Sequence, residues 1–131
     1  AAGYKLDLTN LAKRNHTIEC RINAENAKDF SPSPGRINFI NVPGGRGVRV
    51  DTALYTNYKV NPHYDSLVLK IVSKGKDRNE AISIMKRSLD EIIIDGIDTN
   101  IELHKWILKQ KDFSDGTYNT NWLEKNISKF N

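Results

Sequence analysis

The feature that most constrains the fold of this 131-residue chain is a change in the spacing of its apolar residues. Within residues 16–23 the apolar side chains occupy alternate positions, which predicts a half-buried strand with Arg21 on its polar face. From Asp77 onward the apolar residues recur every three or four positions, as on an amphipathic helix. The sequence therefore predicts strands first and helices afterwards.

Strands are also predicted from the turns rich in Pro and Gly that separate the apolar segments. The predicted strands are 16–23, 36–42, 48–53 and 67–73. The predicted helices begin near Asp77, Thr99 and 119 or 120, where Asp77-x-x-Glu80 and Thr99-x-x-Glu102 would cap the first two. Because short connections favour antiparallel pairing, the expected fold class is α+β, an antiparallel β-sheet followed by C-terminal α-helices.

Composition narrows the class of protein. A hydrophobic content of 38% is enough for the core of one domain. The longest apolar run, 92–94, is far shorter than the roughly 20 residues that cross a bilayer, so we expect no membrane contact. The single cysteine, Cys20, cannot form an internal disulfide and suits a reducing compartment, which makes the cytoplasm the expected location.

The charge distribution leaves one alternative open. The net charge is +4, and the basic excess lies in residues 1–50, which carry eight Lys/Arg and four Asp/Glu. Arg36 near Phe39 resembles the charge-plus-aromatic pattern of nucleic-acid-binding modules. With only 8% aromatic residues and no recognised binding motif, this class is the less favoured one.

Three other candidate sites are weak. The loop Pro43-Gly44-Gly45-Arg46-Gly47 could hold a phosphate, but a strand is predicted to follow it, which favours a tight turn. His16 and Cys20 are about 13 Å apart on a strand, too far to share a metal ion, so no metal site is predicted and Cys20 should be a buried thiol. Glu19 and Glu25 could form a carboxylate pair, but no spacing places them opposite each other.

The stretch from Glu19 to Glu25 presents an arginine on a rigid strand between an acid and an amide. An arginine held in this way suits binding of a carboxylate or of a developing oxyanion. A structural salt bridge from Arg21 to Glu19 or another acid is the alternative, and on the residues alone it is favoured. Spacing leaves both interpretations open.

A resemblance adds to these observations. Residues 16–25, HTIECRINAE, closely resemble the signature that opens the C-terminal domain of biotin carboxylases. Later landmarks follow in the family's order: Pro32-Ser33-Pro34-Gly35, Pro43-Gly44-Gly45 with Gly47-Val48-Arg49, Tyr64-Asp65-Ser66 with Lys70, and Asp95-Gly96-Ile97 with Thr99-Asn100. The resemblance implies that 15–131 is this domain and that 1–14 is a linker from a preceding ATP-grasp domain that is missing here.

The resemblance implies a part in an ATP-dependent carbon–nitrogen ligase. The family uses ATP, Mg or Mn, and bicarbonate to carboxylate N1 of biotin on a biotin carboxyl carrier protein. Arg21 matches the arginine of the ECRINAE motif, which is implied to be catalytic by stabilising negative charge on the ureido oxygen of biotin. Other domains would hold ATP and the metal, so no ATP-binding residue and no activity are expected in this chain alone.

Homodimerisation is also implied, with Arg46, Arg49 and Asp65 at or near the interface. Arg46 stands where some bacterial members carry an aromatic residue. The chain ends shortly after the third predicted helix, which favours the subunit of acetyl-CoA carboxylase that serves fatty acid biosynthesis. His63 resembles the pyruvate enzymes, so a pyruvate or other acyl-CoA carboxylase remains the alternative.

Overall fold

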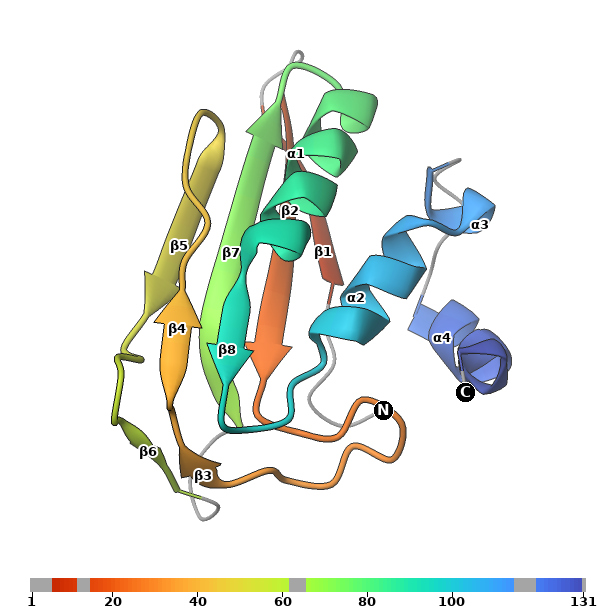
Figure 1. Cartoon of the computed structure of the whole chain (residues 1–131). Helices are drawn as coiled ribbons and strands as arrows, with labels where there is room; N and C mark the ends of the chain where they lie inside the picture. Colours follow the sequence, from red (N-terminus) through yellow and green to blue (C-terminus); the bar gives the residue numbers. More distant parts are fainter. Residues whose placement is uncertain (1–5, 12–14, 62–65, 115–119, 131) are drawn as a thin grey trace.

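The computed structural model describes residues 6–11, 15–61, 66–114 and 120–130, and in them helices cover one face of a four-stranded antiparallel sheet (Figure 1). The strands in spatial order are β1 (Leu6–Leu11), β2 (Asn15–Asn23), β7 (Leu67–Gly75) and β5 (Val48–Thr52). The long strands β2 and β7 pair at the centre, with Cys20 opposite Ile71. The α+β class is confirmed.

β1 was not predicted. Its residues lie in the segment 1–14 that the sequence assigns to a linker, and they pair with β2 from Leu6 opposite Cys20 to Leu11 opposite Asn15. The linker interpretation therefore leaves out six residues that belong to the sheet.

Two small sheets lie beside the main one (Figure 1): β3 (Gly35–Arg36) pairs with β6 (Lys59–Val60), and β4 (Phe39–Asn41) pairs with β8 (Ile93–Asp95). The strand predicted at 36–42 is thus two strands with different partners. Fully buried Ile37 lies between them and packs with Ala24 and Val60 in a second small core. β8 was not predicted, because a short apolar run after a helix fits a helix end as well as a strand.

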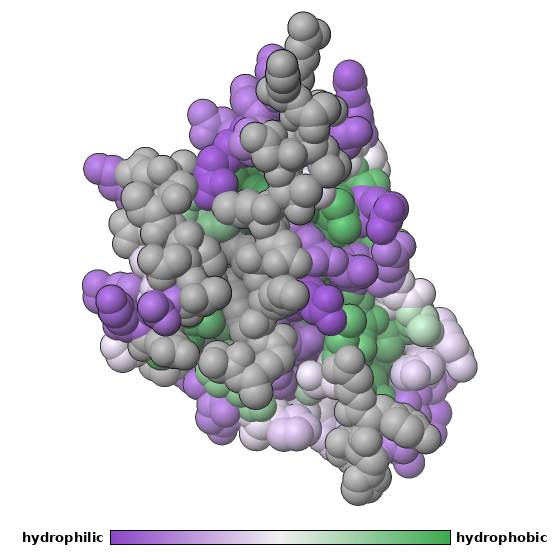
Figure 2. Space-filling view, turned by 180° about the vertical axis from the view of Figure 1, so that it is seen from behind, coloured by the Kyte–Doolittle hydropathy of each residue, from purple (hydrophilic) through white to green (hydrophobic). Residues whose placement is uncertain are grey.

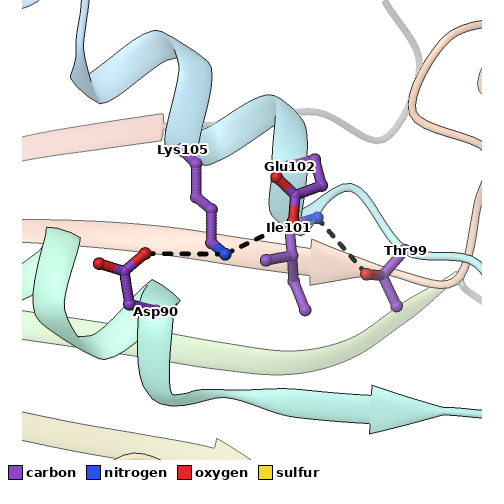
Figure 3. A network of polar contacts seen from close by, with 5 residues as sticks. All are labelled: Asp90, Thr99, Ile101, Glu102 and Lys105. Carbon is purple, nitrogen blue, oxygen red and sulfur yellow. Dashed lines mark hydrogen bonds and ion pairs between the residues drawn. The ribbon is translucent and has the colours of Figure 1, made fainter.

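The helices are α1 (Arg78–Glu91), α2 (Ile101–Leu108), α3 (Lys111–Ser114) and α4 (Thr120–Asn126), with a 3₁₀ turn at Ile127–Lys129. α1 begins as predicted, because the Asp77 side chain accepts a hydrogen bond of 2.8 Å from the Glu80 amide. The prediction for α2 was wrong by one residue: its N-cap is Asn100, and the Thr99 hydroxyl only reaches the Ile101 amide at 3.4 Å (Figure 3).

The main core forms between α1 and the central strands. Alternation on β2 and β7 and helical spacing on α1 turn apolar side chains toward each other. The buried residues are Ile18, Cys20, Ile22, Leu69, Ile71, Ala81, Ile82, Met85 and Leu89. Each large member contributes about 1.5–3 kcal/mol through removal from water. The predicted burial of Cys20 is confirmed.

α2 joins the sheet through polar side chains. Asn100 and His104 are completely buried, and the His104 Nε2 atom lies 2.9 Å from the Arg21 carbonyl oxygen on β2. Desolvation lowers the pKa of His104 to about 4, although the hydrogen bond to Arg21 acts in the opposite direction. The imidazole is therefore neutral at neutral pH.

Lys105 ties α2 to the end of α1 (Figure 3). Its ammonium lies 3.7 Å from the Asp90 carboxylate and 3.4 Å from that of Glu102. Such partly exposed pairs contribute little stability, about 0–1 kcal/mol each.

The surface seen from behind is mixed, with hydrophilic residues around separate hydrophobic patches (Figure 2). Among the described helices, none is long and apolar enough to span a membrane.

We expect Gly96→Ala to lower the free energy of unfolding by about 2 kcal/mol or more. Gly96 has φ of 115°, and a Cβ atom there would lie 2.1 Å from the Arg36 carbonyl oxygen. Urea denaturation measures the change. Gly44→Ala is the matched control, because a Cβ atom at Gly44 meets nothing within 4 Å. Equal stability of the two variants would contradict the close approach.

His104 should make stability depend on pH. Its pKa rises from about 4 in the folded chain to about 6.5 on unfolding, so the unfolded state binds more protons between these values. We expect stability to fall by on the order of 3 kcal/mol as the pH is lowered through this window, as measured by urea denaturation. The His104→Gln variant should lack this pH-dependent component. Subtracting its pH–stability curve from that of the unchanged chain removes the contributions of other titrating groups, such as Glu25. Parallel pH curves for the two chains would refute the assignment.

Candidate functional site

The candidate site centres on Arg21, which lies on the polar face of β2. The neighbouring residues Cys20 and Ile22 are completely buried, whereas Arg21 is half-buried on the opposite side of the sheet. Its partners across the sheet are Lys70 on β7 and, beyond Lys70, Asp51 on β5. Strand alternation alone therefore places the guanidinium on the face that α1 does not cover.

The acid closest to Arg21 in the motif has a different partner. The Glu19 carboxylate lies 3.4 Å from the Lys70 ammonium, and both side chains are largely shielded from solvent. In the part of the chain that the structure describes, no ion pair joins the Arg21 guanidinium. The alternative in which Arg21 serves as the salt-bridge partner of Glu19 is thus disfavoured.

The backbone of Arg21 is held by residues that the sequence analysis did not assign to the site. The Asn100 Nδ2 atom donates to the Arg21 carbonyl oxygen at 3.2 Å, and the Asn100 Oδ1 atom accepts from the Asn23 amide at 2.8 Å. His104 reaches the same carbonyl. The sequence does carry a signal for these two residues, because both are polar and they lie four positions apart on an otherwise apolar helix face. Buried polar groups need hydrogen-bond partners, so this pattern indicates a polar contact with another element.

The two glutamates proposed as a carboxylate pair are not brought together. Glu19 points to the polar face of β2, whereas Glu25 is 3% exposed beyond the end of the strand, where it pairs with Pro32 in an isolated bridge. The backbone turns between them, because the Glu25 amide donates to the Asn23 carbonyl oxygen at 3.0 Å after β2 has ended. Burial raises the pKa of Glu25, and its hydrogen bond to Asn23 partly offsets this rise.

The glycine-rich loop is a turn, as predicted. Gly45 and Gly47 have φ of 105° and 79°, and β5 rather than a helix follows them. Exposed Arg46 in this turn borders a surface cavity of about 680 Å³, together with Lys76 and Arg87.

Of the residues expected at a dimer interface, Arg46 and Arg49 are both exposed. Arg49 lies on β5 and donates to the Asp51 carboxylate at 3.0 Å, so it is already engaged within its own strand. Asp65, the third residue, lies outside the described residues, as does His63.

No cluster of three or more His, Cys, Asp or Glu side chains suited to a metal ion occurs among the described residues. Burial raises the pKa of the Cys20 thiol, and the charge of Glu19 adds to this effect. A protonated, enclosed thiol is a poor nucleophile and a poor metal ligand.

Comparisons with known proteins agree with this architecture. The family model for the biotin carboxylase C-terminal domain matches residues 19–125. Among relatives, the biotin carboxylase of Pseudomonas aeruginosa is 49% identical over 97% of this chain and 29% of its own length. A pyruvate carboxylase subunit of Methanothermobacter thermautotrophicus is 46% identical over 95% of this chain and 26% of its own length.

Solved structures show the same fold. The biotin carboxylase domain dimer of Hydrogenobacter thermophilus 2-oxoglutarate carboxylase, determined with MgADP, ADP and bicarbonate, superimposes with a TM-score of 0.86 at 40% identity, covering 90% of this chain and 26% of that one. Biotin carboxylase from Campylobacter jejuni gives 0.82 at 44% identity, covering 86% and 25%. The chain thus spans about a quarter of the length of these proteins, and it belongs to the biotin carboxylase C-terminal domain family.

Proposed function

We propose that this chain acts as the C-terminal domain of a biotin carboxylase, in which Arg21 stabilises negative charge on the ureido oxygen of biotin. The observation that supports the proposal is the state of the guanidinium. It lies on the face of a central strand opposite α1, it makes no ion pair with the described residues, and its neighbour Glu19 pairs with Lys70 instead. A cation with unused donors on a rigid element is suited to an anion that develops during the reaction.

The chemistry of the ureido group explains why an arginine serves here. Loss of the proton from N1 to a base outside this chain delocalises negative charge onto the ureido oxygen. N1 of this enolate-like form then attacks the carboxyl carbon of carboxyphosphate, and phosphate leaves. The planar guanidinium can direct two N–H donors at that oxygen, and it stays charged at any working pH. Its interaction strengthens as the charge develops, which lowers the barrier rather than only binding biotin.

The remaining machinery would lie outside this chain. We assign ATP, Mg or Mn, and bicarbonate to ATP-grasp domains that precede this one, with 1–14 as a connection that also supplies β1 to the sheet. Support comes from the partial coverage of the relatives and from the Hydrogenobacter thermophilus domain, which binds MgADP and bicarbonate. In this arrangement the carrier protein brings biotin to the Arg21 face, and the chain alone is inactive.

The proposal extends to assembly through this domain. Exposed Arg46 and Arg49 would lie at or near a homodimer interface together with Asp65. The dimer of the related 2-oxoglutarate carboxylase domain supports this assignment.

For the final acceptor, we favour acetyl-CoA, and with it a cytoplasmic role in fatty acid biosynthesis. The relatives named biotin carboxylase, such as that of Pseudomonas aeruginosa, support this choice. A pyruvate carboxylase is the second candidate, and the 46% identity to the Methanothermobacter thermautotrophicus protein supports it. Transfer of the carboxyl group from carboxybiotin to acetyl-CoA or to pyruvate, measured with the partner transferase, separates the two.

In the full-length enzyme, we expect Arg21→Ala to lower kcat for biotin carboxylation by about 100-fold or more, because a donor aimed at developing charge is lost. The affinity for ATP should change less than about twofold, and Arg21→Lys should recover only part of the rate. Lys86→Ala, an exposed change on α1, is the control. Lost ATP affinity with normal carboxylation would exclude the proposed role.

The 131-residue chain by itself should show no biotin-dependent ATP hydrolysis, because no set of metal ligands is found in its described part. A coupled assay for ADP at millimolar biotin, bicarbonate and MgATP measures this. The prediction would be wrong if the chain formed ADP faster than the protein-free control and Arg21→Ala abolished this activity. That result would show that the site is not divided between domains.

A further inference from the structure

We infer that Asn100 and His104 are positioning residues for Arg21: their side chains continue the hydrogen-bond ladder of β2 beyond the last described pair with β1 and fix the Arg21 peptide group. This inference rests on the proposed function of Arg21. It assigns a role in the reaction to two completely buried side chains, Asn100 at the N-cap of α2 and His104 within α2.

The direction of the backbone groups on β2 supports this role. Peptide N–H and C=O groups of successive strand residues point alternately to the two sides of the strand. The Ala24 amide donates at 2.8 Å to Ser66, which directly precedes β7, so the groups of Arg21 and Asn23 face the other side, where β1 lies. β1 pairs only as far as Leu6 opposite Cys20 in the described chain.

Asn100 occupies the place of the next strand residue. A carboxamide carries one acceptor and a donor pair, the same functions as a peptide group. Its Oδ1 atom accepts from Asn23 at 2.8 Å while its Nδ2 atom donates to Arg21 at 3.2 Å, so one side chain satisfies two backbone groups two residues apart. A single residue of a parallel partner strand bonds to the same two backbone groups, and here a helix N-cap takes its place.

His104 supplies a second donor to the same carbonyl. Because an oxygen of this kind can only accept, the Nε2 atom at 2.9 Å must carry the proton. The contact of 3.3 Å between Nε2 and Asn100 Nδ2 is then an approach of two donors that share one acceptor. Both lone pairs of the Arg21 carbonyl are used, which restricts rotation of its peptide plane.

This support lies where the strand is irregular. The register between β2 and β7 shifts between Ile22 and Asn23, one residue beyond Arg21. A bulge interrupts the ladder and bends a strand, so β7 alone holds this point less firmly. α2 is anchored independently through buried Leu103, Ile107 and Leu108 and through Lys105. The direction of the guanidinium is therefore set from α2.

The experiment uses the full-length enzyme with Asn100→Asp, which replaces the donor to Arg21 by an oxygen, and His104→Leu, which removes the other donor. We expect kcat for biotin carboxylation to fall about 10-fold to 100-fold in each, as for a displaced catalytic group. KM for ATP and biotin-independent ATP hydrolysis should stay within about twofold. His104→Gln, which restores an N–H donor, should recover most of the rate.

A matched control separates positioning from general loosening. Ser73→Ala removes an equally buried hydrogen bond, from the Ser73 hydroxyl to the Ala81 carbonyl at 2.9 Å, but it does not touch the Arg21 peptide. It should leave kcat within about twofold. An equal loss in Ser73→Ala would overturn the inference, as would normal kcat in both α2 variants.

Two further measurements link the effect to Arg21. In an Arg21→Ala background, Asn100→Asp should cause no additional loss of carboxylation, whereas an additional loss would refute the positioning role. In the 131-residue chain, the carbonyl ¹³C resonance of Arg21 should move upfield in Asn100→Asp and His104→Leu, because each variant removes a hydrogen bond to that carbonyl, but not in Ser73→Ala. A resonance that does not move in the two variants would contradict the hydrogen bonds from Asn100 and His104 to Arg21.

The same set distinguishes failure of the inference from failure of the proposed function. Normal carboxylation in Arg21→Ala would overturn the proposed function and this inference together. A loss in Arg21→Ala with normal rates in Asn100→Asp and His104→Leu would overturn the inference alone.

Discussion

The antiparallel register between β2 and β7 is the constraint on which the rest of the structure depends. It places Cys20 opposite Ile71 on the covered face and Arg21 opposite Lys70 on the other face. Because side chains alternate along a strand, a slip of one residue would bury the guanidinium and expose the core. The same pairing that forms the hydrophobic core thus presents the cation, and the packing of α1 against this core stabilises both.

What could be predicted from the sequence depended on local signals. The cap at Asp77, the burial of Cys20 and the order of strands before helices follow from neighbours a few positions apart. β8 escaped prediction because its partner β4 lies more than 50 positions earlier, and a three-residue strand has little pattern of its own. The division of 36–42 into β3 and β4 has the same cause, because each half pairs with a distant segment.

The candidate site shows the same limit. The spacing of apolar residues could place Arg21 on a polar face. It could not show whether Glu19 would form its ion pair with Arg21 or with Lys70, which lies on another strand. Thr99 was the expected cap because of a short-range motif. Asn100 became the N-cap instead, and its side chain bonds to β2, 77 positions earlier. Membership of the biotin carboxylase family needed the spacing of several motifs together, and no single strand or turn would have indicated it.

The neutral state of His104 has an electrostatic consequence for the face around Arg21. Imidazole and carboxamide support the strand without adding net charge, and the nearby Lys70 charge is balanced by Glu19. The two side chains that hold the Arg21 peptide therefore add no cation that would compete with the guanidinium for an arriving anion. Because this support stays uncharged over the neutral range, its own contribution to the potential at Arg21 does not change with pH there.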